Sequence, residues 1–178
     1  MEKLSIISAL KDYQPFDEVE RGYLNAITHF AGRFENVTGR ENTFGHITVS
    51  AILTDREMNH VLLIWHQKLK RWLQPGGHVE EYDDSLHAAA MRELIEEVDL
   101  EGAVFTYDSK AVFDLDVHQI PENAKEPGHF HFDVRFHFFM DKIPIPDGGL
   151  KWVSLADAAL FEQTSLSRFA QKLLNNKK

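Results

Sequence analysis

The chain of 178 residues contains no cysteine and no long hydrophobic run. The absence of cysteine excludes a disulfide framework, a cysteine-ligated zinc, an iron–sulfur cluster and a cysteine nucleophile. Apolar stretches near the N-terminus, such as residues 4–10, are far shorter than the roughly 20 residues that cross a bilayer. The first residues also lack a small-residue cleavage site, so we expect no signal peptide and a cytoplasmic location.

Positive charge is also scarce: the sequence contains 19 Lys and Arg but 28 Asp and Glu, which gives a formal net charge of −9. A net-negative protein has no broad field that attracts a nucleic-acid polymer or an anionic membrane. A small phosphate ester remains a suitable partner if a cation mediates the contact. The apolar share of 43% and the charged share of 26% are typical of a globular domain.

Helical spacing dominates the first forty-odd residues. Leu4, Ile7 and Leu10 recur with a helical period, and a second apolar repeat runs through residues 16–30. Residues 34–43 carry glycine and asparagine and are predicted to form a loop. We therefore divide the chain into an N-terminal helical extension, residues 1–42, packed on a main domain, residues 43–178. Whether the extension mediates a homodimer is left open.

Strand patterns dominate the main domain. A strong helix is expected at residues 84–98, and further helices fill much of 155–174. Strands are expected at 46–53, 61–65, twice within 103–117, at 130–140 and at 151–154. This order predicts an α/β (α+β) fold in which a mixed β-sheet is sandwiched between α-helices.

The predicted helix at 84–98 gathers carboxylates on one flank. At about 100° per residue, Glu93 and Glu96 lie beside an apolar stripe and Glu97 falls within it. Like charges at this spacing each oppose the helix by roughly 0.2–0.5 kcal/mol, and a half-buried carboxylate costs more. A hard cation such as Mg²⁺ would remove both penalties and commonly bridges the phosphates of a substrate. The alternative is a plain solvated acidic face.

This segment, Gly77–Leu100, resembles the Nudix box: glycine, five residues, glutamate, seven residues, then R-E-U-x-E-E-x-G-U, where U is apolar. Gly77 matches the first glycine, and residues 92–97 match the R-E-U-x-E-E core without a mismatch. Residues 75–80 also look like the P-G-G-x-x-E sequence that precedes the box. Two departures are present. Asp99 replaces the late glycine, and the loop is one residue longer, with either Asp83 or Asp84 in place of the box glutamate.

The resemblance implies a Nudix fold and a hydrolase that cleaves a nucleoside diphosphate linked to another group, using Mg²⁺ or Mn²⁺. By matching positions, Glu93, Glu96 and Glu97 would bind metal with help from a backbone carbonyl at Gly77, and one glutamate would act as base. Arg92, one turn before Glu96, would fix its rotamer. A nucleotide sensor without catalysis is one alternative. An isoprenyl-diphosphate isomerase is another, disfavoured because such enzymes rely on a cysteine.

Residues 129–136 alternate strictly between polar and apolar side chains. His129, His131, Asp133 and Arg135 share one face of the predicted strand. This face is either a solvent-exposed side of the sheet or the wall of a substrate cleft. In the second interpretation Arg135 holds a phosphate or carboxylate and the histidines bond to phosphate or a sugar hydroxyl. A different interpretation pairs His131 and Asp133 with another histidine as an Fe(II) facial triad.

Several other residues are candidates for contact with a substrate. His78 lies within the glycine turn, and Trp72, just before that turn, is a candidate for stacking on a base. Glu126, and beside it Glu122, are candidates for an additional acidic residue from a loop distant from the box.

Overall fold

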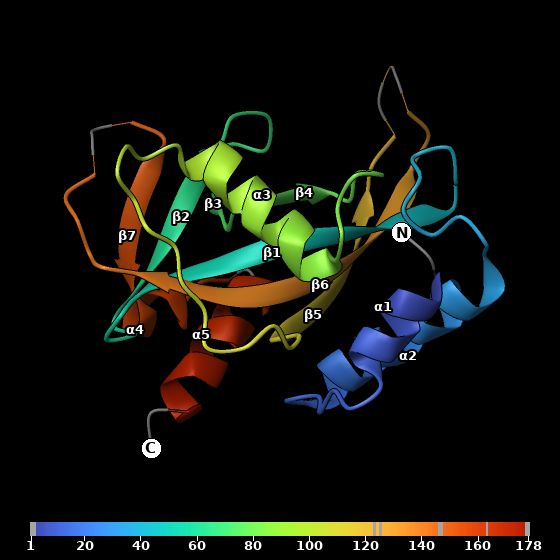
Figure 1. Ribbon diagram of the computed structural model, residues 1–178, viewed down its shortest axis with the longest axis horizontal. Helices are drawn as coiled ribbons and strands as arrows, with labels where there is room; N and C mark the ends of the chain where they lie inside the picture. Colours follow the sequence, from blue (N-terminus) through green and yellow to red (C-terminus); the bar gives the residue numbers. More distant parts are fainter. Residues whose placement is uncertain (1–2, 123, 125, 146–147, 163, 177–178) are drawn as a thin grey trace.

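The computed structural model describes residues 3–122, 124, 126–145, 148–162 and 164–176. Its centre is one seven-stranded sheet, in which the order β3-β2-β1-β6-β5 is completed by β4 beside β1 and β7 beside β2 (Figure 1). The strands are β1 Gly45–Asp55, β2 His60–His66, β3 Arg71–Leu73, β4 Gly76–His78, β5 Asp114–Ile120, β6 His129–Met140 and β7 Leu150–Ser154. The helices are α1 Lys3–Leu10, α2 Glu18–Arg33, α3 Leu86–Val98, α4 Leu155–Ala158 and α5 Thr164–Asn176.

The two longest strands, β1 and β6, run parallel along their whole shared length, from Gly45 opposite Phe130 to Asp55 opposite Met140. The remaining pairings between named strands are antiparallel, so the predicted mixed sheet is confirmed. Because β6 occupies one edge of β1, β4 and β2 share the other edge. β4 pairs with Thr48–Ser50 and β2 with Thr54.

Helices cover both faces of the sheet, as predicted. Val49 of β1 and Leu94 of α3 belong to one buried core, whereas Ile52 of β1 belongs to a second core with Phe169 of α5. Odd and even residues of a strand point to opposite faces, so α3 and α5 lie on opposite sides of β1. Figure 1 shows α3 crossing in front of the sheet and α5 on the other side.

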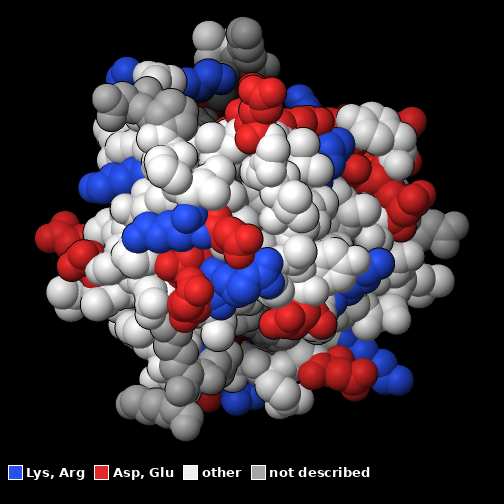
Figure 2. Space-filling model, turned by 60° about the vertical axis from the view of Figure 1, so that its left-hand side comes forward, with Lys and Arg blue, Asp and Glu red and all other residues white. Residues whose placement is uncertain are grey.

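On the face shown in Figure 2, acidic and basic side chains are interspersed between uncharged ones, and neither sign forms a continuous field outside the grey atoms. This face therefore presents no broad positive field. No helix within the described residues is both long and apolar enough to span a membrane.

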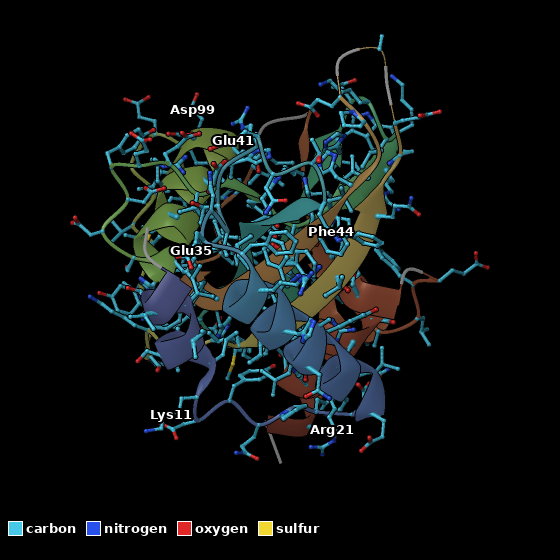
Figure 3. All side chains as sticks on the ribbon, turned by 90° about the vertical axis from the view of Figure 1, so that its right-hand side faces the viewer. Lys11, Arg21, Glu35, Glu41, Phe44 and Asp99 are labelled. Atoms are coloured by element: carbon cyan, nitrogen blue, oxygen red, sulfur yellow. The ribbon has the colours of Figure 1, made fainter. Side chains whose placement is uncertain are left out.

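Of the two N-terminal helices, α1 packs against α2, and α2 packs against β5 and the start of β6. α2 begins at Asp17, whose side chain accepts the Glu20 N–H, and it buries Phe30, whose ring stacks on Phe132 at 4.2 Å between centroids. Phe44, which follows the loop after α2, stacks at 6.1 Å on Phe30 and at 6.3 Å on Phe132 (Figure 3). These contacts place α2 in the same core as the sheet. The division of the chain at residues 42 and 43 stays a prediction.

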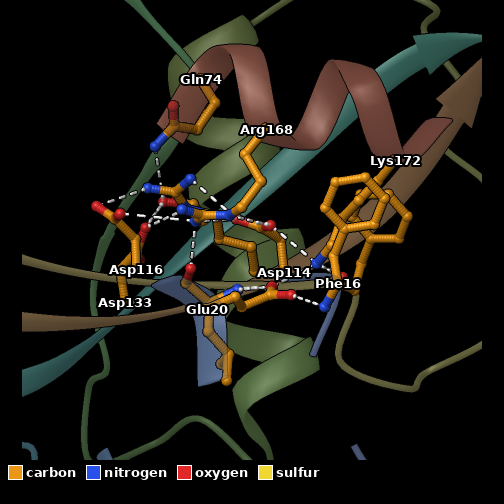
Figure 4. Close-up of polar contacts among 12 residues, drawn as sticks. Phe16, Glu20, Gln74, Asp114, Asp116, Asp133, Arg168 and Lys172 are labelled. Atoms are coloured by element: carbon orange, nitrogen blue, oxygen red, sulfur yellow. Dashed lines mark hydrogen bonds and ion pairs between the residues drawn. The ribbon is translucent and has the colours of Figure 1, made fainter. Parts of the chain in front are cut away.

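A buried network of charged groups joins β5, β6, α2 and α5 (Figure 4). Its members are Glu20, Asp114, Asp116, Asp133, Arg135, Arg168 and Lys172. Arg135 is only 1% exposed and reaches three carboxylates: Asp114 at 3.1 Å, Asp116 at 3.1 Å and Asp133 at 2.7 Å. Burial alone would raise the pKa of Asp116, but Arg135 and its other partners lower that pKa to about 2.

We expect Arg135→Met to lower the free energy of unfolding by about 3–5 kcal/mol, because three buried carboxylates lose their shared cation. Urea unfolding at pH 7 measures this loss. The matched control is Arg56→Met, which removes an exposed pair with Asp141 at 2.9 Å and should leave stability unchanged within error. Equal unfolding midpoints for the two variants would contradict the structural role of Arg135.

Candidate active site

The loop and helix of the box are fixed at both ends by local interactions. Ser85 caps α3 by accepting the Ala88 N–H, which satisfies one of the free donors of the first turn. Asp99 ends the helix in the left-handed conformation, with φ 40° and ψ 49°. Aspartate tolerates this conformation better than most residues with a side chain, so Asp99 takes over the role of the missing glycine.

Asp83, rather than Asp84, takes the place of the box glutamate. Its carboxylate accepts Arg92 Nε at 3.1 Å and Nη2 at 2.9 Å, and it also accepts the Glu80 N–H. The Asp83 side chain is buried, whereas Asp84 is exposed. Burial by itself would raise the pKa of Asp83, but its hydrogen bonds with Arg92 keep it below the usual value. The extra residue of the loop therefore follows Asp83.

Arg92 organises the acidic flank of α3. It donates from Nη1 to Glu93 at 2.7 Å and to Glu96 at 3.3 Å, and from Nη2 to the His78 carbonyl at 2.8 Å. The contact with Glu96 is the one that the sequence predicts. The Arg92 guanidinium contacts the loop, Glu93 and Glu96 at the same time. It therefore fixes the positions of these two glutamate side chains.

The expectation that Glu97 lies inside the apolar stripe is wrong. Its side chain is exposed and turns to the glycine turn, where its carboxylate accepts the Gly76 N–H at 2.8 Å. Partial desolvation of the carboxyl group is the largest cause that raises the pKa of Glu97, and the neighbouring Glu93 and Glu96 act in the same direction. The hydrogen bond from the Gly76 N–H opposes this shift. Glu97 therefore stands at the mouth of a cleft rather than in the core.

Gly77 is the point where the turn approaches α3 most closely. A Cβ atom at this position would lie 2.5–2.7 Å from the carboxylate atoms of Glu93. Only glycine leaves room for Glu93 to rest against the backbone here. The sequence pattern places glycine at this position, and the structure supplies the physical reason.

A cleft of about 270 Å³ opens beside the turn. Of the residues singled out in the sequence, it is lined by Gly77, His78, Glu97, His131 and Asp133. Sequence reasoning missed other lining residues, chiefly Thr48, Ser50, His66, Gln74 and His118. Alternation within β1 could have signalled Thr48 and Ser50, but nothing local marks His118, which reaches the cleft only through the pairing of β5 with β6.

Histidines crowd one end of this cleft. His46 of β1 lies directly beside His131 of β6, and His78 Nε2 is 3.0 Å from His46 Nε2. His129 Nε2 is 3.3 Å from His131 Nε2. Burial, together with the neighbouring histidines, lowers the pKa of His46 to about 4 and that of His131 to about 2. The His46 and His131 imidazoles are therefore neutral at pH 7.

The structure does not support two of the expected substrate contacts. Arg135 lies beneath the cleft with its guanidinium occupied by aspartates, so it has no free donor face for a phosphate. Trp72 is not among the residues that line the cleft, and its ring packs against Trp65 at 5.4 Å between centroids. Glu122 and Glu126 are both exposed in the loop before β6, where their role stays a prediction.

Within the described residues, one group of His, Asp and Glu side chains brings three ligand atoms within 4.8 Å of one another: His46, His129 and His131. The facial triad with Asp133 is not formed, because that carboxylate accepts Thr48 at 3.1 Å, Ser50 at 2.8 Å and the guanidinium of Arg135. The three glutamates of α3 are also not such a group in this structure, since Arg92 holds two of them and Gly76 the third.

Comparison with known families decides the assignment. The family model described as NUDIX domain matches residues 45–174, which is most of the chain. The chain belongs to the Nudix family. This match confirms the resemblance carried by the box and places the chain among the Nudix enzymes. A comparison with curated proteins found no match.

Several solved structures are also similar to the chain. A Nudix-family hydrolase from Clostridium perfringens is 22% identical, with 72% of this chain and 95% of that chain covered and a TM-score of 0.46. The Escherichia coli dihydroneopterin triphosphate pyrophosphohydrolase is 17% identical, with coverage of 79% and 99% and a TM-score of 0.48. Shewanella oneidensis NrtR is 23% identical, with coverage of 74% and 64% and a TM-score of 0.47.

The position of the box residue can be tested by comparing two adjacent aspartates. Asp83→Ala should lower the free energy of unfolding by about 1–3 kcal/mol, because Arg92 loses two charge-assisted hydrogen bonds. Asp84→Ala removes an exposed carboxylate and should change stability by no more than about 0.5 kcal/mol. Thermal and urea unfolding measure both. A larger loss for Asp84→Ala would mean that we have aligned the box incorrectly.

Proposed function

We propose that this protein is a divalent-metal-dependent hydrolase that cleaves the diphosphate bond of a nucleoside diphosphate linked to another group. The observation that carries the proposal is the position of Glu97, whose carboxylate faces the cleft and contacts the backbone of the Gly76–Gly77 turn. Family membership supports the reaction class.

The acidic flank of α3 suits Mg²⁺ or Mn²⁺. Glu93, Glu96 and Glu97 offer the hard oxygen donors that these ions prefer, with the Gly77 carbonyl as a candidate fourth donor. Glu93 approaches Gly77 so closely that its carboxylate occupies the space that a Cβ atom would need. When bound, the metal would polarise the phosphoryl oxygens and lower the pKa of a water.

The protein's own groups have separate tasks in this proposal. Glu97 stands free of Arg92 and accepts the proton of the attacking water, while Arg92 keeps Glu93 and Glu96 in position. His78, His118 and His131 present imidazole nitrogens along the cleft, where they donate hydrogen bonds to phosphate or sugar oxygens. Asp133 is held by Thr48 and Ser50, so it serves to fix the floor of the cleft.

The partner in this proposal is a small molecule. A cleft of about 270 Å³ suits one nucleotide-like diphosphate better than a polymer. The formal charge of −9 also argues against a polyanion, because only the local metal offsets the repulsion of phosphate. A panel of such compounds, assayed with Mg²⁺ or Mn²⁺ and read by product identity, would define the leaving group. Release of no product from the whole panel would refute the hydrolase.

Glu97→Gln should lower the rate of hydrolysis by roughly 10²–10⁴-fold, the usual contribution of a general base. The substitution keeps the size of the side chain, so circular dichroism and the melting temperature should stay near those of the wild type. Glu101→Gln, an exposed carboxylate just after α3, is the matched control and should keep full activity. Full activity of Glu97→Gln would exclude this residue as the base.

Gly77→Ala should also impair turnover, because the new Cβ displaces the carboxylate of Glu93. A shift of about 1 Å in a catalytic group can cost roughly 10²-fold in rate. Steady-state kinetics across a range of Mg²⁺ concentrations measure the effect. Gly22→Ala, in an open position of α2, provides the control and should not reduce activity or stability. Unchanged kinetics in Gly77→Ala would show that the close approach is unimportant.

A further inference from the structure

The histidine group at the end of the cleft has a use that the glutamate site does not explain. His46 and His131 are direct neighbours on parallel strands, and His129 lies two residues earlier on the same face of β6. One ring nitrogen from each lies within 4.8 Å of the other two. His46 is 3% exposed and His129 is 6% exposed, so the group is part of the interior rather than a chance gathering on the surface.

The hydrogen bonds of these rings favour lone pairs that converge. His129 Nδ1 lies 2.9 Å from the Pro127 carbonyl, which only accepts, so Nδ1 carries the proton and Nε2 presents its lone pair. A backbone carbonyl that fixes the tautomer in this way is the usual outer support of a metal-ligating histidine. The His129 and His131 Nε2 atoms are 3.3 Å apart, close to the roughly 3.3–3.4 Å expected between two nitrogens of a tetrahedral zinc site.

An unpaired atom in the same group also points to a missing ligand. His46 Nδ1 is buried and has no hydrogen-bond partner among the described residues. Buried polar atoms are nearly always paired, so each exception calls for an explanation. A bound cation would supply the missing partner, and rotation of the His46 ring toward that cation would break the contact between His46 and His78.

We propose that His46, His129 and His131 form a second metal centre, which binds a divalent transition-metal ion such as Zn²⁺. Neutral imidazole suits Zn²⁺ and its neighbours in the first transition series, whereas Mg²⁺ prefers oxygen. Three histidines with one further position form a common donor set for zinc with an exchangeable ligand. His131 lines the cleft, so that position faces the substrate, where a phosphate oxygen, a water or the nearby His78 would complete the coordination.

The metal content of this centre can be tested without turnover. Purified full-length protein is stripped with a chelator, dialysed into excess Mg²⁺ and titrated with Zn²⁺ by calorimetry, with bound metal counted by elemental analysis. We expect one Zn²⁺ per chain to be retained in the presence of Mg²⁺. His129→Asn and His131→Asn should each weaken this binding by more than about 100-fold, because loss of a ligand exceeds the effect of losing an outer support.

Two controls isolate the site. His137→Asn changes another histidine on the same face of β6, bonded to Thr54 at 2.9 Å, and should leave zinc binding unchanged. Glu97→Gln should also bind zinc normally, which separates this centre from the acidic flank of α3. X-ray absorption of the zinc-loaded wild type should show three imidazole ligands and needs no variant to fold.

Three outcomes would overturn the proposal. The first is a wild type that loses zinc to Mg²⁺. The second is zinc affinity in His129→Asn and His131→Asn equal to that of the wild type, which would mean binding at other histidines. The third is an absorption spectrum dominated by oxygen ligands. Failure of these tests would leave the Glu97 prediction untouched, and inactivity of the hydrolase would leave the zinc stoichiometry untouched.

Discussion

The parallel pairing of β1 with β6 is the constraint on which both the core and the cleft depend. It sets His46 beside His131, Thr48 beside Asp133 and Ser50 beside Arg135. It also keeps Val49 beside Val134 on the face that packs under α3. Because side chains alternate along a strand, a slip of one residue would exchange the polar and apolar faces of β1 against those of β6. The register is therefore held by burial on one side and by polar contacts on the other.

The polar side of this ladder is stable because its charges are balanced underneath. Burial would by itself raise the pKa of Asp114, but Arg135, Arg168 and Lys172 keep it below its usual value. Lys172 and Arg168 come from α5 and also contact Glu20 of α2 or the backbone of β5, so they tie both ends of the chain to the floor of the cleft. Buried ion pairs add little net stability over apolar packing, but leaving one partner alone is costly. The network therefore specifies where the elements meet more than it strengthens them.

Features that depend on interactions between residues close in sequence could be predicted from the sequence. Features that depend on contacts between distant segments could not. The contact of Arg92 with Glu96 was predictable because a helix fixes the spacing of side chains over a few residues, but the same reasoning placed Glu97 wrongly. The polar face of residues 129–136 was predictable for the same reason, since alternation in a strand is local. The burial of Arg135 among carboxylates was not predictable. Its partners Asp114 and Asp116 lie on β5, in a segment where the sequence suggested two strands. The structure instead has β5 at Asp114–Ile120 and a single bridge between Thr106 and Phe139.

The short strand β4 explains how carboxylates and imidazoles occur side by side without mixing. Consecutive residues of a strand point to opposite faces, so Gly77 backs onto Glu93 of α3 whereas His78 turns to His46. The carboxylates, which are hard donors, thus gather above β4 and the imidazoles, which are borderline donors, gather below it. An ion that prefers oxygen and an ion that prefers nitrogen would be sorted by the two faces of one three-residue strand. The cleft lies along that strand, so a diphosphate bound there would reach both faces at once.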